Sequence, residues 1–161
     1  MLLAVLLNGC TELNSSNVEQ GSEALRPAGG SKTSSSYALR TTAQKSTKPT
    51  WQSSFPINST YDVHFAFEVP SSVKGHHVAT VFVFMPNLST YQRFDLPFAT
   101  DVAASSGEQQ AQKLSTGYRV WASMPVAGTI IEQYSLTGDW RADAYLDGAS
   151  TVAAKASFSL Q

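Results

Sequence analysis

The chain from Trp51 onward alternates between apolar and polar residues with a period of two. Between 61 and 69, Tyr, Val, Phe, Phe and Val occupy the odd positions, and polar residues or alanine occupy the even ones. Successive side chains of a strand point to opposite faces, so this pattern predicts a strand with one buried face and one wet face. Similar runs at 91–98, 118–124 and 140–146 predict more strands of the same kind.

Other segments depart from strict alternation. Residues 78–85 are almost continuously apolar and rich in Val and Phe, which predicts a central strand buried on both faces. Residues 129–136 supply a further candidate strand. The polar run at 103–114 fits either a short helix or a loop.

The clearest supersecondary signal is a hairpin at the end of the sequence. The alternating run 140–146 is followed by Asp147-Gly148, a typical hairpin turn, and then by a second alternating run at 152–160. About seven short strands separated by turn residues predict an all-β fold, a two-sheet antiparallel immunoglobulin-like sandwich over residues 51–161. With a single cysteine in the chain, no internal disulfide can join the sheets, so aromatic packing must hold them together.

Composition changes sharply before this domain. Of the 17 aromatic residues, all but Tyr37 lie in residues 51–161. The segment 11–50 contains eight Ser, six Thr, three Gly and two Pro, which predicts that residues 10–50 form a flexible, disordered linker. A coil of that length spans about 35 Å. The formal net charge of the whole chain is −1, which leaves no basic excess for a nucleic-acid partner.

The only cysteine lies close to the amino terminus. Cys10 follows the apolar run 2–7, which is too short to cross a bilayer but resembles the apolar region of a signal peptide. The sequence Leu-Asn-Gly-Cys at 7–10 resembles the lipobox of bacterial lipoproteins. That resemblance implies that residues 1–9 are a signal peptide, complete or truncated, and that Cys10 is acylated. In Gram-negative lipoproteins an aspartate directly after the cysteine commonly retains the protein in the inner membrane. Thr11 occupies that position here, so the resemblance favours the outer membrane. A cytoplasmic protein with an idle thiol is the alternative.

The final hairpin also resembles a known type of domain. The run Gly-Asp-Trp-Arg-Ala-Asp-Ala-Tyr-Leu-Asp-Gly at 138–148 and the earlier Gly-Tyr-Arg-Val-Trp at 117–121 are similar to the last strands of bacterial immunoglobulin-like or fibronectin-type sandwiches. Such domains occur in secreted and surface proteins. The resemblance implies a fold and a location in the cell envelope, and it transfers no catalytic residue.

Motifs that would indicate an enzyme are missing from the sequence. It has no phosphate-binding loop, dinucleotide fingerprint, zinc-protease helix or nucleophile elbow. His76 and His77 are adjacent on a predicted strand and so point to opposite faces, which disfavours a shared metal ion. A hydrolase would need two carboxylates in one cleft, and the spacing brings no such pair together. We therefore expect a non-catalytic protein without cofactor or metal.

Aromatic side chains on polar strand faces are the remaining candidates for ligand contact. They are Trp51, Trp121, Tyr91 and Tyr145. The leading hypothesis is a lipid-anchored structural or protein-interaction module of the bacterial envelope. It would contact another envelope protein through a sheet edge or end loops. The alternative is a module that binds wall or surface polysaccharide by stacking sugars on these rings.

Overall fold

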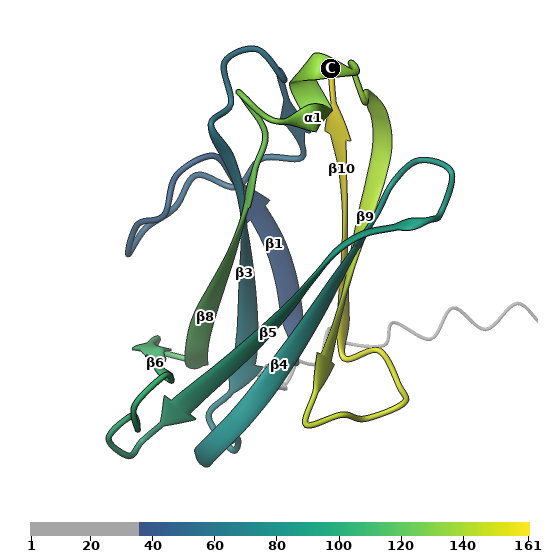
Figure 1. Cartoon of the computed structure of the whole chain (residues 1–161). Coiled ribbons are helices and arrows are strands. Elements are labelled where there is room, and N and C mark those ends of the chain that lie inside the picture. The colour runs from purple at the N-terminus through teal and green to yellow at the C-terminus, as the bar shows by residue number, and fades with distance from the viewer. Residues whose placement is uncertain (1–35) are drawn as a thin grey trace, which may run out of the picture. The chain divides into compact units, whose positions relative to one another are not determined.

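Two β-sheets pack face to face in the computed structural model, which describes residues 36–161 (Figure 1). The first sheet has the order β1-β3-β8-β7, with β1 at Ala38–Thr42, β3 at Asp62–Pro70, β8 at Gly117–Pro125 and β7 at Gln112–Lys113. The second has the order β2-β10-β9-β4-β5-β6, with β2 at Ser54–Phe55, β10 at Ala154–Leu160, β9 at Gly138–Leu146, β4 at Gly75–Phe84, β5 at Thr90–Thr100 and β6 at Gln109–Gln110. A short helix, α1, spans Ile130–Gln133.

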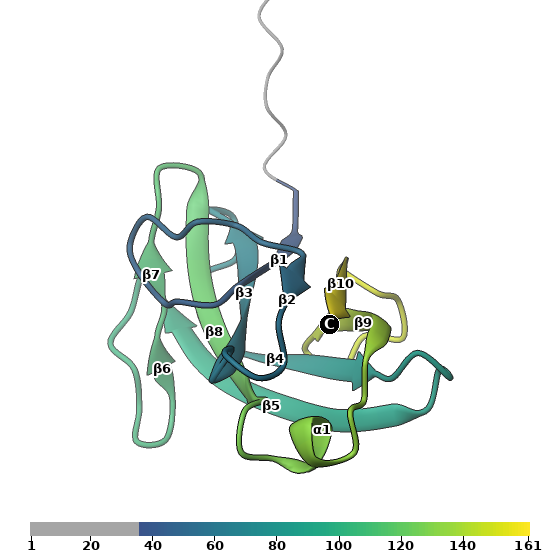
Figure 2. The same ribbon diagram turned by 90° about the horizontal axis from the view of Figure 1, so that it is seen from above.

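The predicted immunoglobulin-like sandwich is confirmed. Seven of the strands have five or more residues, and every pairing among them is antiparallel. The chain passes from one sheet to the other between β3 and β4, between β5 and β8, and between β8 and β9 (Figure 2). These crossings place β1-β3-β8 opposite β10-β9-β4-β5, the Greek-key arrangement of this fold class. The short strands β2 and β6 pair parallel to β10 and β5.

The core consists of the inward-facing positions of both sheets. Val63, Phe65 and Phe67 of β3 are completely buried, as the alternation predicts. Trp140 is 1% exposed, and its ring lies 6.2 Å from that of Phe158. Phe158 in turn meets Phe65 of the opposite sheet edge to face at 5.5 Å. Aromatic pairs of this kind each contribute about 0.5–1.5 kcal/mol beyond their buried area, so they join the sheets where a disulfide is missing.

The predicted start of the domain at Trp51 is wrong. Strand β1 lies within the segment assigned to the linker, and it pairs with β3 from Ala38 opposite Glu68 to Thr42 opposite His64. Its residues are mostly Ala, Thr and Arg, with Leu39 as the single large apolar side chain, so composition alone disguises the strand. The folded domain therefore begins before residue 38, and residues 1–35 lie outside the described part.

The prediction of a strand at 129–136 is also wrong. This segment forms α1, because the Thr129 hydroxyl accepts a hydrogen bond from the Ile131 amide and caps the helix, while Ile131 fills the core. The prediction that 78–85 is a strand buried on both faces is correct for one face only. Val81 and Val83 are completely buried, but the outward-facing Phe82 and Phe84 are only half-buried.

The final hairpin has a longer connection than predicted. Asp147 and Gly148 adopt positive φ angles of 51° and 69°, as a tight turn requires, and the Ala149 amide donates to the Leu146 carbonyl. The return strand nevertheless begins only at Ala154, after further loop residues. The Asp147 carboxylate accepts from the Val78 amide at 2.9 Å, which ties this loop to β4. The polar run 103–114 is a loop with the short strands β6 and β7.

The loops gather at the two ends of the sandwich. One end holds the segments 56–61, 85–89 and 126–137, together with α1 (Figure 1). The other end holds 71–74, 101–116 and 147–153. The described chain enters β1 at the second end, because Ala38 pairs with Glu68 near the end of β3. We call the second end the chain-entry end.

Candidate functional site

Four aromatic and basic side chains alternate on the outer face of the β1-β3-β8-β7 sheet. The guanidinium of Arg40 lies 5.2 Å from the centre of the Trp51 ring, and that of Arg119 lies 5.1 Å from the same ring. Arg119 also lies 5.4 Å from the centre of the Trp121 ring. Each distance is within the range of a cation–π contact. We call Arg40, Trp51, Arg119 and Trp121 the basic–aromatic ladder.

The strand register places these residues together. Arg40 is opposite Ala66, and Ala66 is opposite Trp121 across the β3–β8 pair. Ala66 lies on the outer face and yet is completely buried, which shows that larger side chains cover it. The small residue at this position leaves room for Trp51, which follows the long loop after β1. Two of the predicted contact residues, Trp51 and Trp121, therefore share one surface.

An ion pair fixes the centre of the ladder. Arg119 is opposite Glu68 in the strand register, and its Nε donates to Glu68 Oε1 at 3.0 Å. The two side chains are only 7% and 17% exposed. Arg119 Nη1 is buried without a hydrogen-bond partner among the described residues. Because a buried charge is costly when unpaired, Glu68 and the two rings hold Arg119 in place.

The loop between β1 and β2 forms the rim of this surface, and Figures 1 and 2 both draw it beside β3 and β8. The Gln52 amide donates to the Thr41 carbonyl at 2.9 Å, and the Thr41 hydroxyl donates to the Gln52 carbonyl, so the two ends of the loop are joined. Gln52 lines two hollows, one of about 320 Å³ and one of about 270 Å³. The first is lined by residues that include Arg40, Trp51, Ser53 and Ser157, and the second by residues that include Thr42, Gln44, Ser46, Lys48 and Thr50.

A histidine lies in the same sheet face. His64 Nδ1 is 2.9 Å from the hydroxyl oxygen of Ser123 on the neighbouring strand. Burial lowers the pKa of His64, and the positive charge of Lys45 on the β1–β2 loop lowers it further. The neutral form is therefore favoured in the folded protein, and Lys45 acts on the same face as the ladder.

A different surface lies at the end opposite the chain-entry end. The four most exposed large apolar side chains among the described residues all belong to it: Tyr61 at 81%, Tyr134 at 68%, Leu88 at 67% and Ile130 at 51%. Ile130 and Tyr134 are one turn apart, and the Tyr134 amide donates to the Ile130 carbonyl. The Val126 amide donates to the Tyr61 carbonyl and holds the two loops together. We call this surface the apolar end.

The other predicted contact residues lie apart from the ladder. Tyr91 packs edge to face against the core residue Trp140, with ring centres 5.2 Å apart, and is half-buried. Tyr145 lies on the outer face of the second sheet and packs edge to face on Phe82 at 5.7 Å. Cys10 and the predicted signal peptide lie outside the described residues.

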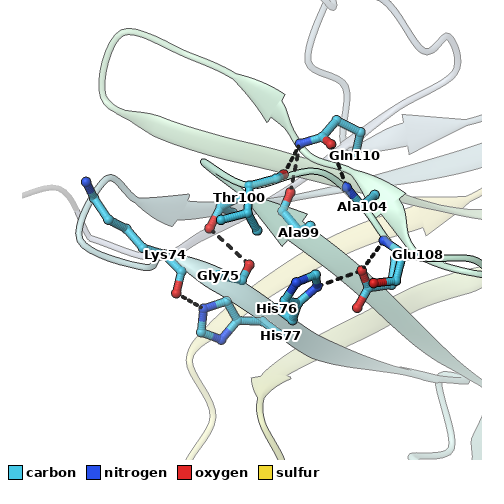
Figure 3. Close-up of polar contacts among 11 residues, drawn as sticks. Lys74, Gly75, His76, His77, Ala99, Thr100, Ala104, Glu108 and Gln110 are labelled. Atoms are coloured by element: carbon cyan, nitrogen blue, oxygen red, sulfur yellow. Dashed lines mark hydrogen bonds and ion pairs between the residues drawn. The ribbon is translucent and has the colours of Figure 1, made fainter.

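The adjacent histidines have separate partners, as expected from their alternation. His76 Nδ1 lies 2.8 Å from a carboxylate oxygen of Glu108, and His77 Nδ1 lies 2.8 Å from one of Asp147. Figure 3 shows His76 beside Glu108 and His77 beside the Lys74 carbonyl. Within residues 36–161 no three His, Cys, Asp or Glu side chains are grouped as metal ligands. In the same range no helix has the length and apolarity to cross a membrane.

Sequence reasoning found the two tryptophans but missed their partners. Arg119 follows Tyr118 on the polar side of an alternating strand, and Glu68 occupies the same side of another. An opposite-charge pair across two neighbouring strands could have been proposed if their register were known. The apolar end was missed because the alternation at 61–69 assigns Tyr61 to the buried face of a strand, and Tyr134 falls in the strand predicted at 129–136. Both side chains lie instead in loops at the end of the sandwich and are exposed.

Comparison with known proteins identifies no family. No family model matches the chain, and no characterised protein matches it. Among solved structures, the chain is similar to the CARDB domain of the PF1109 protein from Pyrococcus furiosus, whose crystal structure is a complex with di-metal ions. The two share 9% identity with a TM-score of 0.39 over 78% of this chain and 86% of that one. The fold assignment given above rests on the strands and their order.

Proposed function

We propose that the chain is a lipid-anchored, non-catalytic interaction module of the bacterial cell envelope, and that it binds another envelope protein through the apolar end. The observation that carries the proposal is the position of the four most exposed apolar side chains, all at the end away from the chain-entry end. Large apolar side chains exposed at one end of a domain favour a protein-binding role for that end.

The position of the chain entry is compatible with binding at the apolar end. If Cys10 is acylated, the anchor joins the domain through the start of β1, which lies at the end of the sandwich away from the apolar end. A partner in the periplasm or at the cell surface can then reach Tyr61, Ile130 and Tyr134 without displacing the anchor.

The open sheet edges are less suited to binding a partner strand. The long edge strand β5 has Arg93 and Asp95 paired at 2.9 Å, and Pro97 interrupts its amide row. On β8, the side-chain amide of Gln109 bonds both the carbonyl and the amide of Trp121. Charges, proline and capped backbone groups are the usual protection of edges against strand addition. End loops are therefore the better interaction surface of the two that we predicted.

The anchoring step is tested by metabolic labelling with palmitate in a bacterial host. We expect label in the wild-type protein and none in Cys10→Ala, which should move from the membrane fraction to the soluble fraction. Equal label in both proteins, or none in either, contradicts the anchor.

The interaction step is tested by affinity capture from solubilised envelopes with the full chain as bait. We expect one protein to be retained by the wild type and lost with Tyr61→Ser/Tyr134→Ser. Thr151→Ala, at the chain-entry end, is the control and should retain it. Loss with the control variant alone, or retention by all three baits, contradicts binding at the apolar end.

Polysaccharide binding remains the second candidate function. It is favoured by the shared surface of Trp51 and Trp121 and by the two hollows beside Gln52. However, Arg119 lies against both rings, so simple stacking of a sugar between the tryptophans is blocked. A ligand on this surface would bind beside the ladder, at Trp51 and the β1–β2 loop.

A further inference from the structure

The segment that frames the ladder carries an unbalanced positive charge. Residues 36–61 contain Arg40, Lys45 and Lys48 and no acidic residue. The ion pairs of the described domain involve other cations, so these three have no carboxylate partner within residues 36–161. Arg119, by contrast, is neutralised by Glu68.

Two of the three cations line the hollows, one in each. Arg40 lines the hollow of about 320 Å³ beside Trp51, and Lys48 lines the one of about 270 Å³. Lys45 lies close enough to His64 to influence its titration. Gln52 lines both hollows, so they adjoin at this residue, and each contains one cation.

Most of the remaining lining residues are polar and uncharged, and the apolar ones besides Trp51 are Leu39, Ala43 and Ala156. Hydroxyl groups come from Thr42, Ser46, Thr50 and Ser53, and amides from Gln44 and Gln52. Such groups both donate and accept, as sugar hydroxyls require. The half-buried Trp51 adds one apolar ring edge beside them.

The surface is also held rigid. The Thr41–Gln52 bonds close the loop, and Trp51 contacts the guanidiniums of Arg40 and Arg119. A preorganised surface loses little conformational entropy when a ligand binds. Binding to a lipid bilayer favours protruding apolar side chains with cations around them, and this surface is hollow and polar instead.

We propose that the two hollows beside Gln52 bind a carboxylate-bearing polysaccharide, with Arg40 and Lys48 contacting its acidic groups. The planar guanidinium of Arg40 suits a carboxylate, and Lys48 supplies a point charge to the next acidic residue of the polymer. The inference deepens the second candidate function and is independent of the protein partner at the apolar end.

The test measures binding of the full chain, in mild detergent, to immobilised alginate, a polyuronate. Dextran serves as the neutral polymer, and vesicles containing phosphatidylglycerol serve as the anionic lipid. We expect binding to alginate that weakens as salt is raised, and no binding to dextran. Arg40→Gln/Lys48→Gln should raise the Kd for alginate at least about tenfold, because each charged contact contributes more than a neutral one.

The control variant is Arg93→Gln/Lys155→Gln, which removes the same charge from the outer face of the second sheet. It should change the Kd by less than about twofold. Equal losses in the two variants, no binding to alginate, or binding only to the vesicles would each overturn the proposal. Circular dichroism spectra of both variants verify folding. Capture through Tyr61 and Tyr134 is measured separately, so either proposal can fail alone.

Discussion

Replacing Arg119 by alanine removes the central member of the ladder and leaves the Glu68 carboxylate, which is 17% exposed, without its partner. Breaking a buried ion pair from one side costs about 3–5 kcal/mol. Two cation–π contacts, at 5.1 and 5.4 Å, are lost with it. Because all these contacts share one guanidinium, their energies do not add, and we expect a total loss of about 3–5 kcal/mol.

Urea unfolding followed by circular dichroism measures this loss. With a slope of about 2 kcal/mol per M, the midpoint should fall by about 2 M. The matched control is Arg93→Ala, whose ion pair with Asp95 has both side chains about half exposed, at 56% and 49%, and should cost less than about 1 kcal/mol. The double variant Arg119→Met/Glu68→Leu should recover at least about half of the loss. A cost for Arg119→Ala that matches the control refutes the structural role of the ladder.

Other consequences of the fold can be tested by single substitutions. Gly117→Ala should destabilise the domain by at least about 2 kcal/mol in urea unfolding, because a Cβ there would lie 2.0 Å from the Val69 carbonyl oxygen. An effect below about 0.5 kcal/mol, the size typical of a surface substitution, would contradict that contact. The pKa of His64 is lowered by burial, so stability is full above the ordinary histidine pKa and falls as pH drops below it toward the folded pKa. His64→Gln should reduce the dependence of the melting temperature on pH between pH 7 and 5. An unchanged dependence would show that other groups cause it. Asp147→Ala removes the bond to the Val78 amide and should cost about 1–2 kcal/mol, whereas Asp147→Asn, whose side-chain oxygen can still accept that bond, should cost less. Equal losses would contradict the contribution of this hydrogen bond.

Much of the architecture follows from the period-two pattern. The buried faces of β3 and β8 are the apolar positions that the alternation selects, and Trp140 lies in the core as its place in the last hairpin predicts. These strands are recognisable because each carries several large apolar side chains on one face. Strand β1 carries one, Leu39, and its existence depends on pairing with β3, which local sequence does not encode.

The candidate site was predictable only in part, for a similar reason. Trp51 and Trp121 stand out as aromatic residues on polar positions, but their common surface depends on strand register and on Ala66 leaving space between them.

The helix at 130–133 is a segment where the local sequence favours the wrong secondary structure. Its β-branched residues favour a strand locally, and the Thr129 cap together with burial of Ile131 overrides that preference. Tertiary contacts therefore decide the features that matter most for binding.

The central claim is that the protein meets its partner at the end away from the chain entry. Site-specific photo-crosslinking in intact cells tests it most directly, with a benzophenone amino acid placed at Tyr134 in one strain and at Thr151, which is exposed at the chain-entry end, in another. We predict a discrete crosslinked adduct with a second protein from position 134 and none from position 151. An adduct from 151 alone, or none from 134 in cells that express the protein at its normal level, would contradict the account.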